Sequence, residues 1–347
     1  MFKIDLVTRD GASIAFDADS SDTLLDAAAK SNIFLPAACR EGGCGTCRAT
    51  RKTGIVALEP YSRSALTDAD RAAGDILLCR AKAYSDLELS APFDKSAIGF
   101  SAVPERSARI AEISSAGAGA VRLVLRYEDD PAHGRAAEFT PGQFMELTLP
   151  GTTVTRAYSL ANTPNWDGTL EFLIRLHPHG AFSAYLVDRA KAGDLLLVKG
   201  PQGSFAADEA SQAPRWFVAG GTGVAPILSM LRRMAEFGDA REARLFFGVN
   251  RQEELFAIDS IEESKTALPR LDATICVWKA QPGWSDFAGT PAEALAAALA
   301  EGSARPDIYV CGPPALIDAT EAVGLRAGVP RDRIFSERFS PAAHGAI

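Results

Sequence analysis

Residues 39–47 read CREGGCGTC and contain three of the six cysteines of the chain. Four residues separate Cys39 from Cys44, two separate Cys44 from Cys47, and Cys79 follows after 31 further residues. This spacing is typical of the ligands of a plant-type [2Fe–2S] cluster. The glycines of the loop permit tight turns and let backbone N–H groups approach cluster sulfurs. We therefore predict that these four cysteines hold a [2Fe–2S] cluster.

Two other interpretations of the cysteine loop stay open. A structural zinc site usually takes its ligands from paired C-x2–4-C knuckles, whereas here three cysteines share one loop and Cys79 is distant. The four cysteines can also be unconnected. In a reducing compartment, clustered cysteines indicate metal or redox chemistry more often than disulfides. Metal analysis distinguishes these cases.

The residues around the loop, from 1 to about 95, are predicted to form a small domain of their own. Alternating apolar and polar residues predict strands, at residues 2–7, 12–18 and 86–92. Ser21 or Asp22 is expected to cap a short helix over 23–31. Residues 67–76 predict a second short helix followed by a strand into Cys79. Residues 92–105 show no periodicity and are predicted to be a linker.

The sequence pattern changes at about residue 106, where predicted short strands are separated by turns rich in Gly, Pro and Asn. Regularly spaced short strands favour an antiparallel barrel. The predicted strands are residues 108–114, 120–127, 142–150, 155–161, 170–176 and 194–201.

From about residue 213, strands alternate with helices, which predicts a parallel sheet covered on both faces. The predicted strands are residues 215–221, 243–249, 271–279, 307–313 and 333–339. The predicted helices are residues 225–237, 254–264, 290–302 and 314–328.

Length and composition exclude several classes of protein. The chain has 347 residues, of which 47% are hydrophobic and 23% charged, and this rules out a disordered chain, a collagen or a disulfide-dense mini-protein. The net charge is −8 and no basic run occurs, so we expect no nucleic-acid binding. No stretch approaches 18 uninterrupted apolar residues and the N-terminus lacks an apolar signal core, so we expect a soluble, cytoplasmic protein without membrane contact.

Two short motifs in the barrel segment point to a flavin. In Arg156-Ala157-Tyr158-Ser159, Arg can neutralise a pyrophosphate, Tyr can lie against an isoalloxazine ring and Ser can hydrogen-bond the flavin N5. Gly180-Ala181-Phe182-Ser183 precedes a helix, where N–H groups can face phosphate. Each motif is weak alone, because Arg and Tyr on a strand are usually surface and core residues. We favour surface roles for Arg175 and for the loop histidines His177 and His179.

Two glycine-containing turns in the last segment point to a dinucleotide. Gly220-Gly221-Thr222-Gly223-Val224-Ala225-Pro226 lies between a strand and a helix, where a pyrophosphate can dock. Cys311-Gly312-Pro313-Pro314 ends the fourth strand of this segment. Because ligands of open parallel sheets bind beyond the carboxyl ends of the strands, both turns are expected to line one crevice. Cys311 can also be a small core residue, which is how we interpret Cys276.

The last predicted strand ends in Phe335, Glu337 and Phe339. An aromatic ring near this end is placed to stack on the flavin where the nicotinamide must enter. Burial in a strand is the competing interpretation, and it is stronger for Phe335 than for Phe339.

These motifs, in this order, resemble the ferredoxin–NADH reductase components of bacterial multicomponent oxygenases. RAYSLAN is similar to the flavin motif of that family, GGTGVAP to its nucleotide loop, CGPP to its nicotinamide-side turn and ERF to its terminal motif. The resemblance covers essentially the whole chain. The stretches LEFLIRLHPHGAFSAYL and FFGVNRQEELF are most similar to reductases of diiron monooxygenases acting on methane, alkanes or phenol. Reductases of benzoate-type dioxygenases and of cytochromes P450 share the scaffold.

The resemblance implies three domains: a β-grasp ferredoxin domain over 1–95, a β-barrel FAD domain over 104–208, and an α/β NAD-binding domain over 212–347. It also implies that NADH reduces FAD, which passes single electrons through the cluster to a separate oxygenase. The FAD contacts implied are Arg156, Ala157, Tyr158, Ser159, Gly180 and Ser183, with Phe339 shielding the ring. The NADH contacts implied are Gly221, Thr222, Gly223, Cys311 and Gly312. The catalytic residues implied are Ser159, Cys311 and Glu337.

The choice between NADH and NADPH depends on the residues after Val249. Glu253 and Glu254 would repel a 2′-phosphate while Arg251 would attract one, and we favour NADH. Arg40 and Arg48 flank the cysteine loop, and we hypothesise that they dock an acidic patch of the oxygenase. We expect a monomer.

Three rival functions stay open at this stage. A self-contained NADH oxidase or quinone-type reductase would have no need of a one-electron exit. A ferredoxin-type carrier without NADH oxidation would leave the RAYS, GGTG and CGPP motifs unexplained. A structural zinc protein is the third.

Overall fold

The computed structural model describes residues 1–37, 39–100, 103–302 and 305–338. The described chain divides into two units: the first contains Met1–Pro104 and Gln202–Ser204, and the second contains Glu105–Pro201 and the residues from Phe205 onward. No helix within the described ranges has both the length and the apolar composition needed to cross a membrane.

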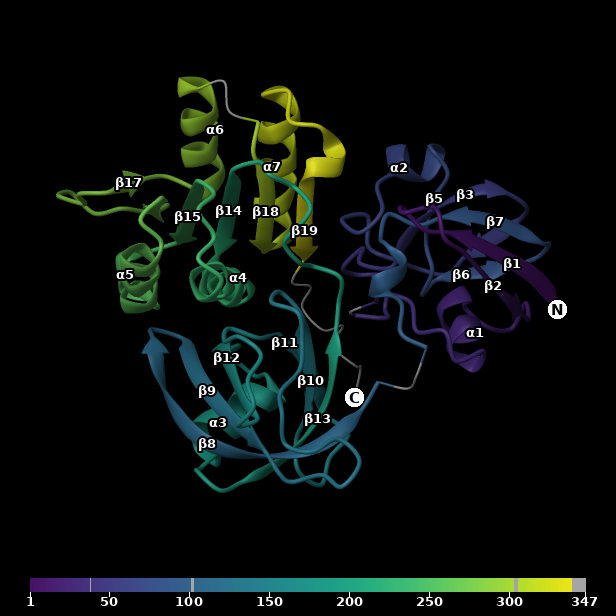
Figure 1. Ribbon diagram of the computed structural model, residues 1–347, viewed down its shortest axis with the longest axis horizontal. Helices are drawn as coiled ribbons and strands as arrows, with labels where there is room; N and C mark the ends of the chain where they lie inside the picture. Colours follow the sequence, from purple (N-terminus) through teal and green to yellow (C-terminus); the bar gives the residue numbers. More distant parts are fainter. Residues whose placement is uncertain (38, 101–102, 303–304, 339–347) are drawn as a thin grey trace. The chain divides into compact units, whose positions relative to one another are not determined.

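The first unit is a five-stranded mixed sheet packed against a short helix, which confirms the predicted α+β ferredoxin-type fold. The strand order is β2-β1-β7-β3-β5; β1 and β7 run parallel, and β4 pairs with β6 beside the sheet. Alternating side chains, such as Ile4 and Leu6 of β1, form a buried core with Leu24 of the helix. Figure 1 shows this unit in purple and blue. Its elements are β1 (Phe2–Val7), β2 (Ser13–Ala18), α1 (Leu24–Lys30), β3 (Arg48–Thr53), β4 (Val56–Leu58), α2 (Asp68–Ala72), β5 (Asp75–Leu77), β6 (Ala81–Ala83), β7 (Leu87–Ser90) and η1 (Lys95–Ala97).

The second unit begins with a six-stranded antiparallel barrel, as predicted. The strand order is β11-β10-β13-β8-β9-β12, and a bridge between Leu160 and Phe172 joins the first and last strands. Both residues are fully buried in the barrel core. The elements are β8 (Glu105–Gly117), β9 (Ala120–Tyr127), β10 (Phe144–Thr148), β11 (Thr155–Ser159), β12 (Thr169–Arg175), α3 (Ala181–Asp188) and β13 (Leu195–Gln202).

The same unit continues into a six-stranded parallel sheet with helices on both faces, which confirms the α/β prediction. The strand order is β17-β16-β15-β14-β18-β19. One hydrophobic core lies between the sheet and α4, and a second lies between the sheet and the helices α6 and α7. Its elements are β14 (Arg215–Gly220), η2 (Gly221–Gly223), α4 (Val224–Glu236), β15 (Ala243–Val249), η3 (Gln252–Glu254), α5 (Ile258–Ala267), β16 (Leu271–Val277), β17 (Phe287–Ala288), α6 (Pro291–Glu301), β18 (Asp307–Gly312), α7 (Pro314–Arg326), η4 (Arg331–Arg333) and β19 (Ile334–Arg338).

Two helix starts differ from the prediction. Thr23, rather than Ser21 or Asp22, caps α1, because its side chain accepts a hydrogen bond from the N–H of Asp26. The helix predicted from residue 254 begins at Ile258, because Ala257 has the left-handed φ of 58° that ends the preceding turn. The strands β3, β4, β6 and β17 were not predicted. The domain boundaries at residues 95, 104, 208 and 212 stay predictions.

Candidate active site

The four cysteines of the predicted cluster converge as two pairs in the first unit. The thiol of Cys44 interacts with that of Cys39 and lowers its pKa, and the Sγ atoms of Cys47 and Cys79 lie 3.2 Å apart. Two pairs of thiols match two irons, each bound by two sulfurs. The donor set therefore fits a [2Fe–2S] cluster. No group of three metal-binding side chains around a single ion occurs among the described residues.

The backbone of the loop is shaped around these thiols. The N–H groups of Glu41 and Gly43 point at the Sγ of Cys39, at 3.4 and 3.2 Å. Gly42 has a φ of 72°, and a Cβ atom there would lie 2.8 Å from the Cβ of Tyr61. Only glycine combines this backbone conformation with so close an approach. N–H groups aimed at a cysteine sulfur stabilise a negative charge on it.

One of the two arginines predicted to dock the oxygenase already forms ion pairs within the first unit. Arg48 forms ion pairs with Asp70 and Asp75, at 3.1 and 3.7 Å, and donates to the carbonyl of Ala65. Its side chain is 22% exposed. Arg48 thus ties the loop that precedes α2 to the first unit, and the docking role of Arg40 and Arg48 stays a prediction.

The predicted flavin motif lies on β11, at the edge where the barrel meets the parallel sheet. Tyr158 packs edge-on against Phe182 of α3, with ring centroids 5.1 Å apart. This contact brings the two predicted flavin motifs together. The guanidinium of Arg156 donates only to the carbonyl of Thr155 within its own strand. Among the described residues no carboxylate forms an ion pair with Arg156, so its positive charge is available to a phosphate.

A side chain within α3 holds the loop that precedes this helix. Ser183 accepts a hydrogen bond from the N–H of His177, and Gly180 is the N-cap residue. Among the described residues no side chain caps α3, so the N–H groups of its first turn are left for a ligand or water. His177 and His179 are exposed on this loop, as predicted for solvated residues.

The two glycine turns of the parallel sheet meet at the carboxyl ends of β14 and β18. A Cβ atom on Gly223 would lie 2.2 Å from the carbonyl oxygen of Cys311. Gly312 has a φ of 150°, and a Cβ there would lie 3.2 Å from the backbone N of Gly220. The absence of side chains lets the two turns pack backbone to backbone. The two turns therefore lie next to each other at the end of the sheet where a dinucleotide is expected.

The three predicted catalytic residues converge at this junction. Ser159 ends β11 of the barrel, and its Oγ donates to a carboxyl oxygen of Glu337 on β19 at 3.2 Å. Cys311 on β18 stands opposite Glu337 in the strand register. All three side chains are buried. The barrel and the parallel sheet thus share one buried polar cluster.

Burial changes the protonation of this cluster. It raises the pKa of the Glu337 carboxyl to about 8, although the hydrogen bond from Ser159 acts in the opposite direction. Burial, reinforced by the neighbouring Glu337, raises the pKa of the Cys311 thiol well above its ordinary value. At neutral pH Glu337 is therefore mostly protonated and Cys311 is a thiol.

Arg175, interpreted from the sequence as a surface charge, reaches the nucleotide loop. Its guanidinium lies 3.7 Å from the position that a Cβ atom on Gly221 would take. Only the position of Arg175 at the end of a barrel strand could have signalled this contact. Phe339, the predicted flavin shield, lies outside the described residues.

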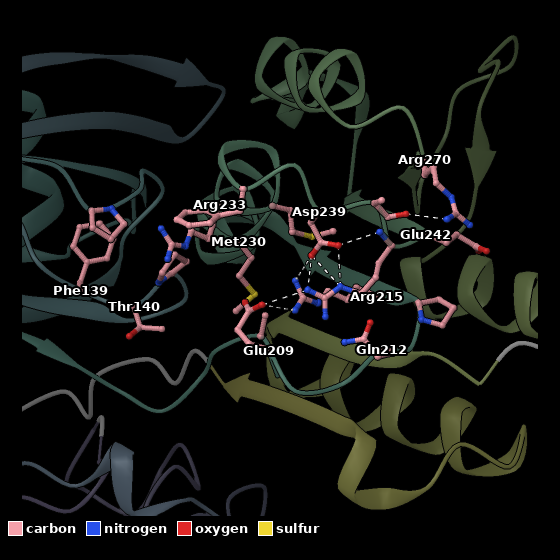
Figure 2. A pocket seen from close by; sticks show the side chains of 18 residues that line it. Phe139, Thr140, Glu209, Gln212, Arg215, Met230, Arg233, Asp239, Glu242 and Arg270 are labelled. Carbon is pink, nitrogen blue, oxygen red and sulfur yellow. Dashed lines mark hydrogen bonds and ion pairs between the residues drawn. The ribbon is translucent and has the colours of Figure 1, made fainter.

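The cavity drawn in Figure 2 lies away from this cluster. It has a volume of about 780 Å³ and lies at the amino end of β14, between the barrel loop around Phe139 and the second half of α4. Its charged side chains largely pair with one another, since Asp239 binds both Arg215 and Arg241. Because parallel sheets bind ligands at the opposite strand ends, this cavity is separate from the place where the dinucleotide is expected.

Comparison with known protein families gives three matches along the chain. A 2Fe-2S iron-sulfur cluster binding domain matches residues 7–84. An oxidoreductase FAD-binding domain matches residues 123–206, and an oxidoreductase NAD-binding domain matches residues 217–322. The cofactors are therefore FAD, a [2Fe–2S] cluster and NADH, which excludes the structural zinc protein.

Relatives match almost the whole chain. The reductase component of propane 2-monooxygenase from Rhodococcus jostii (strain RHA1) is 32% identical over 95% of this chain and 90% of that protein. Methane monooxygenase component C of Methylosinus trichosporium is 37% identical over 86% and 87%. The toluate 1,2-dioxygenase electron transfer component of Pseudomonas putida is 30% identical over 96% and 97%.

A solved structure shares the whole architecture. The Amycolatopsis cytochrome P450 reductase GcoB is 28% identical, with a TM-score of 0.76, over 99% of this chain and 100% of that one. These findings rule out a carrier that lacks NADH oxidation. The chain belongs to the reductase components of multicomponent oxygenases, and it transfers electrons from NADH through FAD and a [2Fe–2S] cluster to a separate oxygenase.

Proposed function

We propose that this reductase serves a diiron monooxygenase that hydroxylates a small hydrocarbon. The relatives whose names include propane and methane monooxygenase support this choice of partner. The alternatives are a Rieske-type dioxygenase, supported by the toluate relative, and a cytochrome P450, supported by GcoB. We further propose a monomer in the cytoplasm, where free thiols stay reduced. Electron transfer to purified oxygenases of the three classes, under identical conditions, separates the candidates.

The observation that carries the enzymatic proposal is the buried contact between Ser159 and Glu337. It places a hydroxyl from the flavin motif, a protonated carboxyl and the thiol of Cys311 in one cluster beside the nucleotide turns. A hydride donor and its acceptor react only when they are held in contact and water is excluded. The burial of Ser159, Cys311 and Glu337 at the junction of the barrel and the parallel sheet supports this assignment, because it shields these groups from water.

We assign the flavin to the barrel residues of the two motifs. The Arg156 guanidinium neutralises the FAD pyrophosphate, and the Tyr158 ring, fixed by Phe182, lies against the flavin. With FAD bound, the Ser159 hydroxyl donates its one hydrogen to the ring N5 and accepts a hydrogen bond from the protonated Glu337 carboxyl. The remaining contacts proposed are Ala157, Gly180, Ser183 and, at the chain end, Phe339. When bound, FAD supplies the conversion of a hydride into single electrons.

We assign NADH to the turns of the parallel sheet. The N–H groups of Gly221, Thr222 and Gly223 hold its pyrophosphate at the start of α4. Gly312 lets the nicotinamide approach Cys311 without a side chain in the way. Glu337 is mostly neutral below about pH 8. It therefore places no negative charge beside the flavin ring where the hydride arrives.

The raised pKa of Glu337 gives a pH-dependent prediction. If only the neutral carboxyl supports the reaction, flavin reduction by NADH slows about tenfold between pH 7 and pH 9. Glu337→Gln should remove this dependence, and stopped-flow absorbance at a series of pH values measures it. Glu301→Gln, an exposed carboxyl on α6, is the control that keeps the wild-type profile.

The same shift predicts a stability effect of known sign. The pKa of Glu337 is higher in the folded chain than in the unfolded one, so its stabilising contribution is full below about pH 4.5 and is lost as the pH rises through about 8. The melting temperature of the wild type should therefore fall relative to Glu337→Gln between pH 6 and pH 8. A constant difference over this range would contradict the assignment.

The cluster ligands give a third prediction. Cys79→Ser removes one of the four sulfurs, so the purified protein should lose cluster iron and electron transfer to the oxygenase. NADH-dependent reduction of ferricyanide, which draws on FAD, should stay within about twofold of wild type. Cys276→Ala, which changes a core cysteine, is the control that keeps both iron and transfer. Full iron content in Cys79→Ser would disprove the ligand set.

The loop after β15 predicts selectivity for NADH over NADPH. Arg251, the one cation that would attract a 2′-phosphate in this loop, pairs with Glu253 at 3.8 Å. Glu254 adds a further negative charge and accepts from the N–H of Asn250. We expect kcat/KM for NADH to exceed that for NADPH by about tenfold or more. Equal or better use of NADPH would show that the loop does not select.

A further inference from the structure

An exposed tryptophan follows β16, which lies two strands away from β14 and the nucleotide loop at its end. Trp278 comes directly after β16, and 57% of its surface is exposed. The ammonium group of Lys279 lies 5.0 Å from the centre of the indole ring. The exposed part of the indole is therefore open to contact with a planar ligand.

The backbone of Trp278 is fixed in line with the nucleotide loop. Its N–H donates to the carbonyl of Val249, and the N–H of Lys279 donates to Asn250, so the pairing of β15 and β16 continues past the strand ends. The side chain of Gln252 accepts from the N–H of Gln281, which ties the two loops together. The backbone on either side of the indole is therefore held by hydrogen bonds at the end of the sheet.

The sheet order places this edge on one side of the nucleotide loop. β18, which carries Cys311, is the neighbour of β14 on one side, and β15 followed by β16 lies on the other. Adjacent strands are about 4.8 Å apart, so Trp278 lies roughly 10 Å along the sheet edge from the loop at Gly221–Gly223. Figure 1 shows β15, β14 and β18 side by side in this order.

A dinucleotide held by its pyrophosphate at that loop must extend in both directions. With the nicotinamide half directed toward Cys311 on β18, the adenosine half passes over β15 and β16. A purine ring stacks well on an aromatic side chain, because every base has an apolar face of matching shape. Trp278 is the exposed aromatic side chain that the described strands carry to this end of the sheet.

We propose that Trp278 is the platform on which the adenine of NADH stacks. This inference rests on the proposed NADH site at the two glycine turns. Lys279 limits the rotation of the indole by lying against it, which reduces the entropy lost on stacking. Trp278 is thus a binding residue that sets the affinity for the adenosine half and leaves the nicotinamide chemistry unchanged.

The test measures the binding of ADP-ribose, which contains the adenosine half but no nicotinamide. Isothermal titration calorimetry of the FAD- and cluster-loaded protein should show binding about tenfold weaker in Trp278→Ala than in wild type. Trp278→Phe, which keeps an aromatic face, should recover most of the affinity. Trp166→Ala is the matched control, because Trp166 is 87% exposed on the barrel and should leave binding unchanged.

A second measurement separates stacking from a general loss of structure. Reduced nicotinamide mononucleotide lacks adenosine, so its kcat/KM for flavin reduction should be equal in Trp278→Ala and wild type, while that of NADH falls about tenfold. Equal ADP-ribose affinity in the two proteins would overturn the platform but leave the NADH site intact. Failure of the wild type to bind ADP-ribose would overturn the NADH site itself.

Discussion

The Ser159–Glu337 hydrogen bond is the contact on which the proposed catalytic arrangement depends. It joins the last residue of a barrel strand to the edge strand of the parallel sheet, 178 residues later in the chain. A buried carboxylate without a cation is expensive, and among the described residues no ion pair to Glu337 is found, so the group remains neutral over most of the physiological range. The contact thus fixes geometry and protonation together.

Other contacts keep this junction in register. Ser229 and Arg232 of α4 donate to the carbonyls of Asn162 and Ala161, at 2.6 and 2.8 Å, in the loop that follows β11. The helix that begins at the nucleotide loop is therefore anchored to the strand that carries the flavin motif. Because rigid elements hold the reacting groups more closely than loops do, this anchoring supports productive contact between the two cofactors.

The sequence was most informative where a motif depends on local geometry. The spacing of Cys39, Cys44 and Cys47 and the glycine turns at Gly221–Gly223 and Gly312 each impose a backbone shape that few other structures need. These residues indicated the three-part fold and the residues of the candidate site. The capping of α1 by Thr23 was missed because Ser21, Asp22 and Thr23 are all good N-cap residues, and only the hydrogen bond to Asp26 distinguishes them.

Long-range pairing could not be predicted from a single chain. The commitment of Arg48 to Asp70 and Asp75 depends on the packing of α2 and β5 beside β3. The approach of Arg175 to Gly221 depends on how the barrel meets the parallel sheet. In both cases an arginine near a motif has several physically reasonable partners, and tertiary structure selects among them.

The most direct test of the central claim is an anaerobic titration of the purified protein with NADH, followed by visible absorbance. FAD takes two electrons and the cluster takes one, so both absorption bands should bleach fully at about one and a half equivalents of NADH. Bleaching of the flavin alone, complete at about one equivalent, would show that electrons do not reach the four-cysteine loop. An unchanged spectrum would contradict the assignment of NADH to the glycine turns.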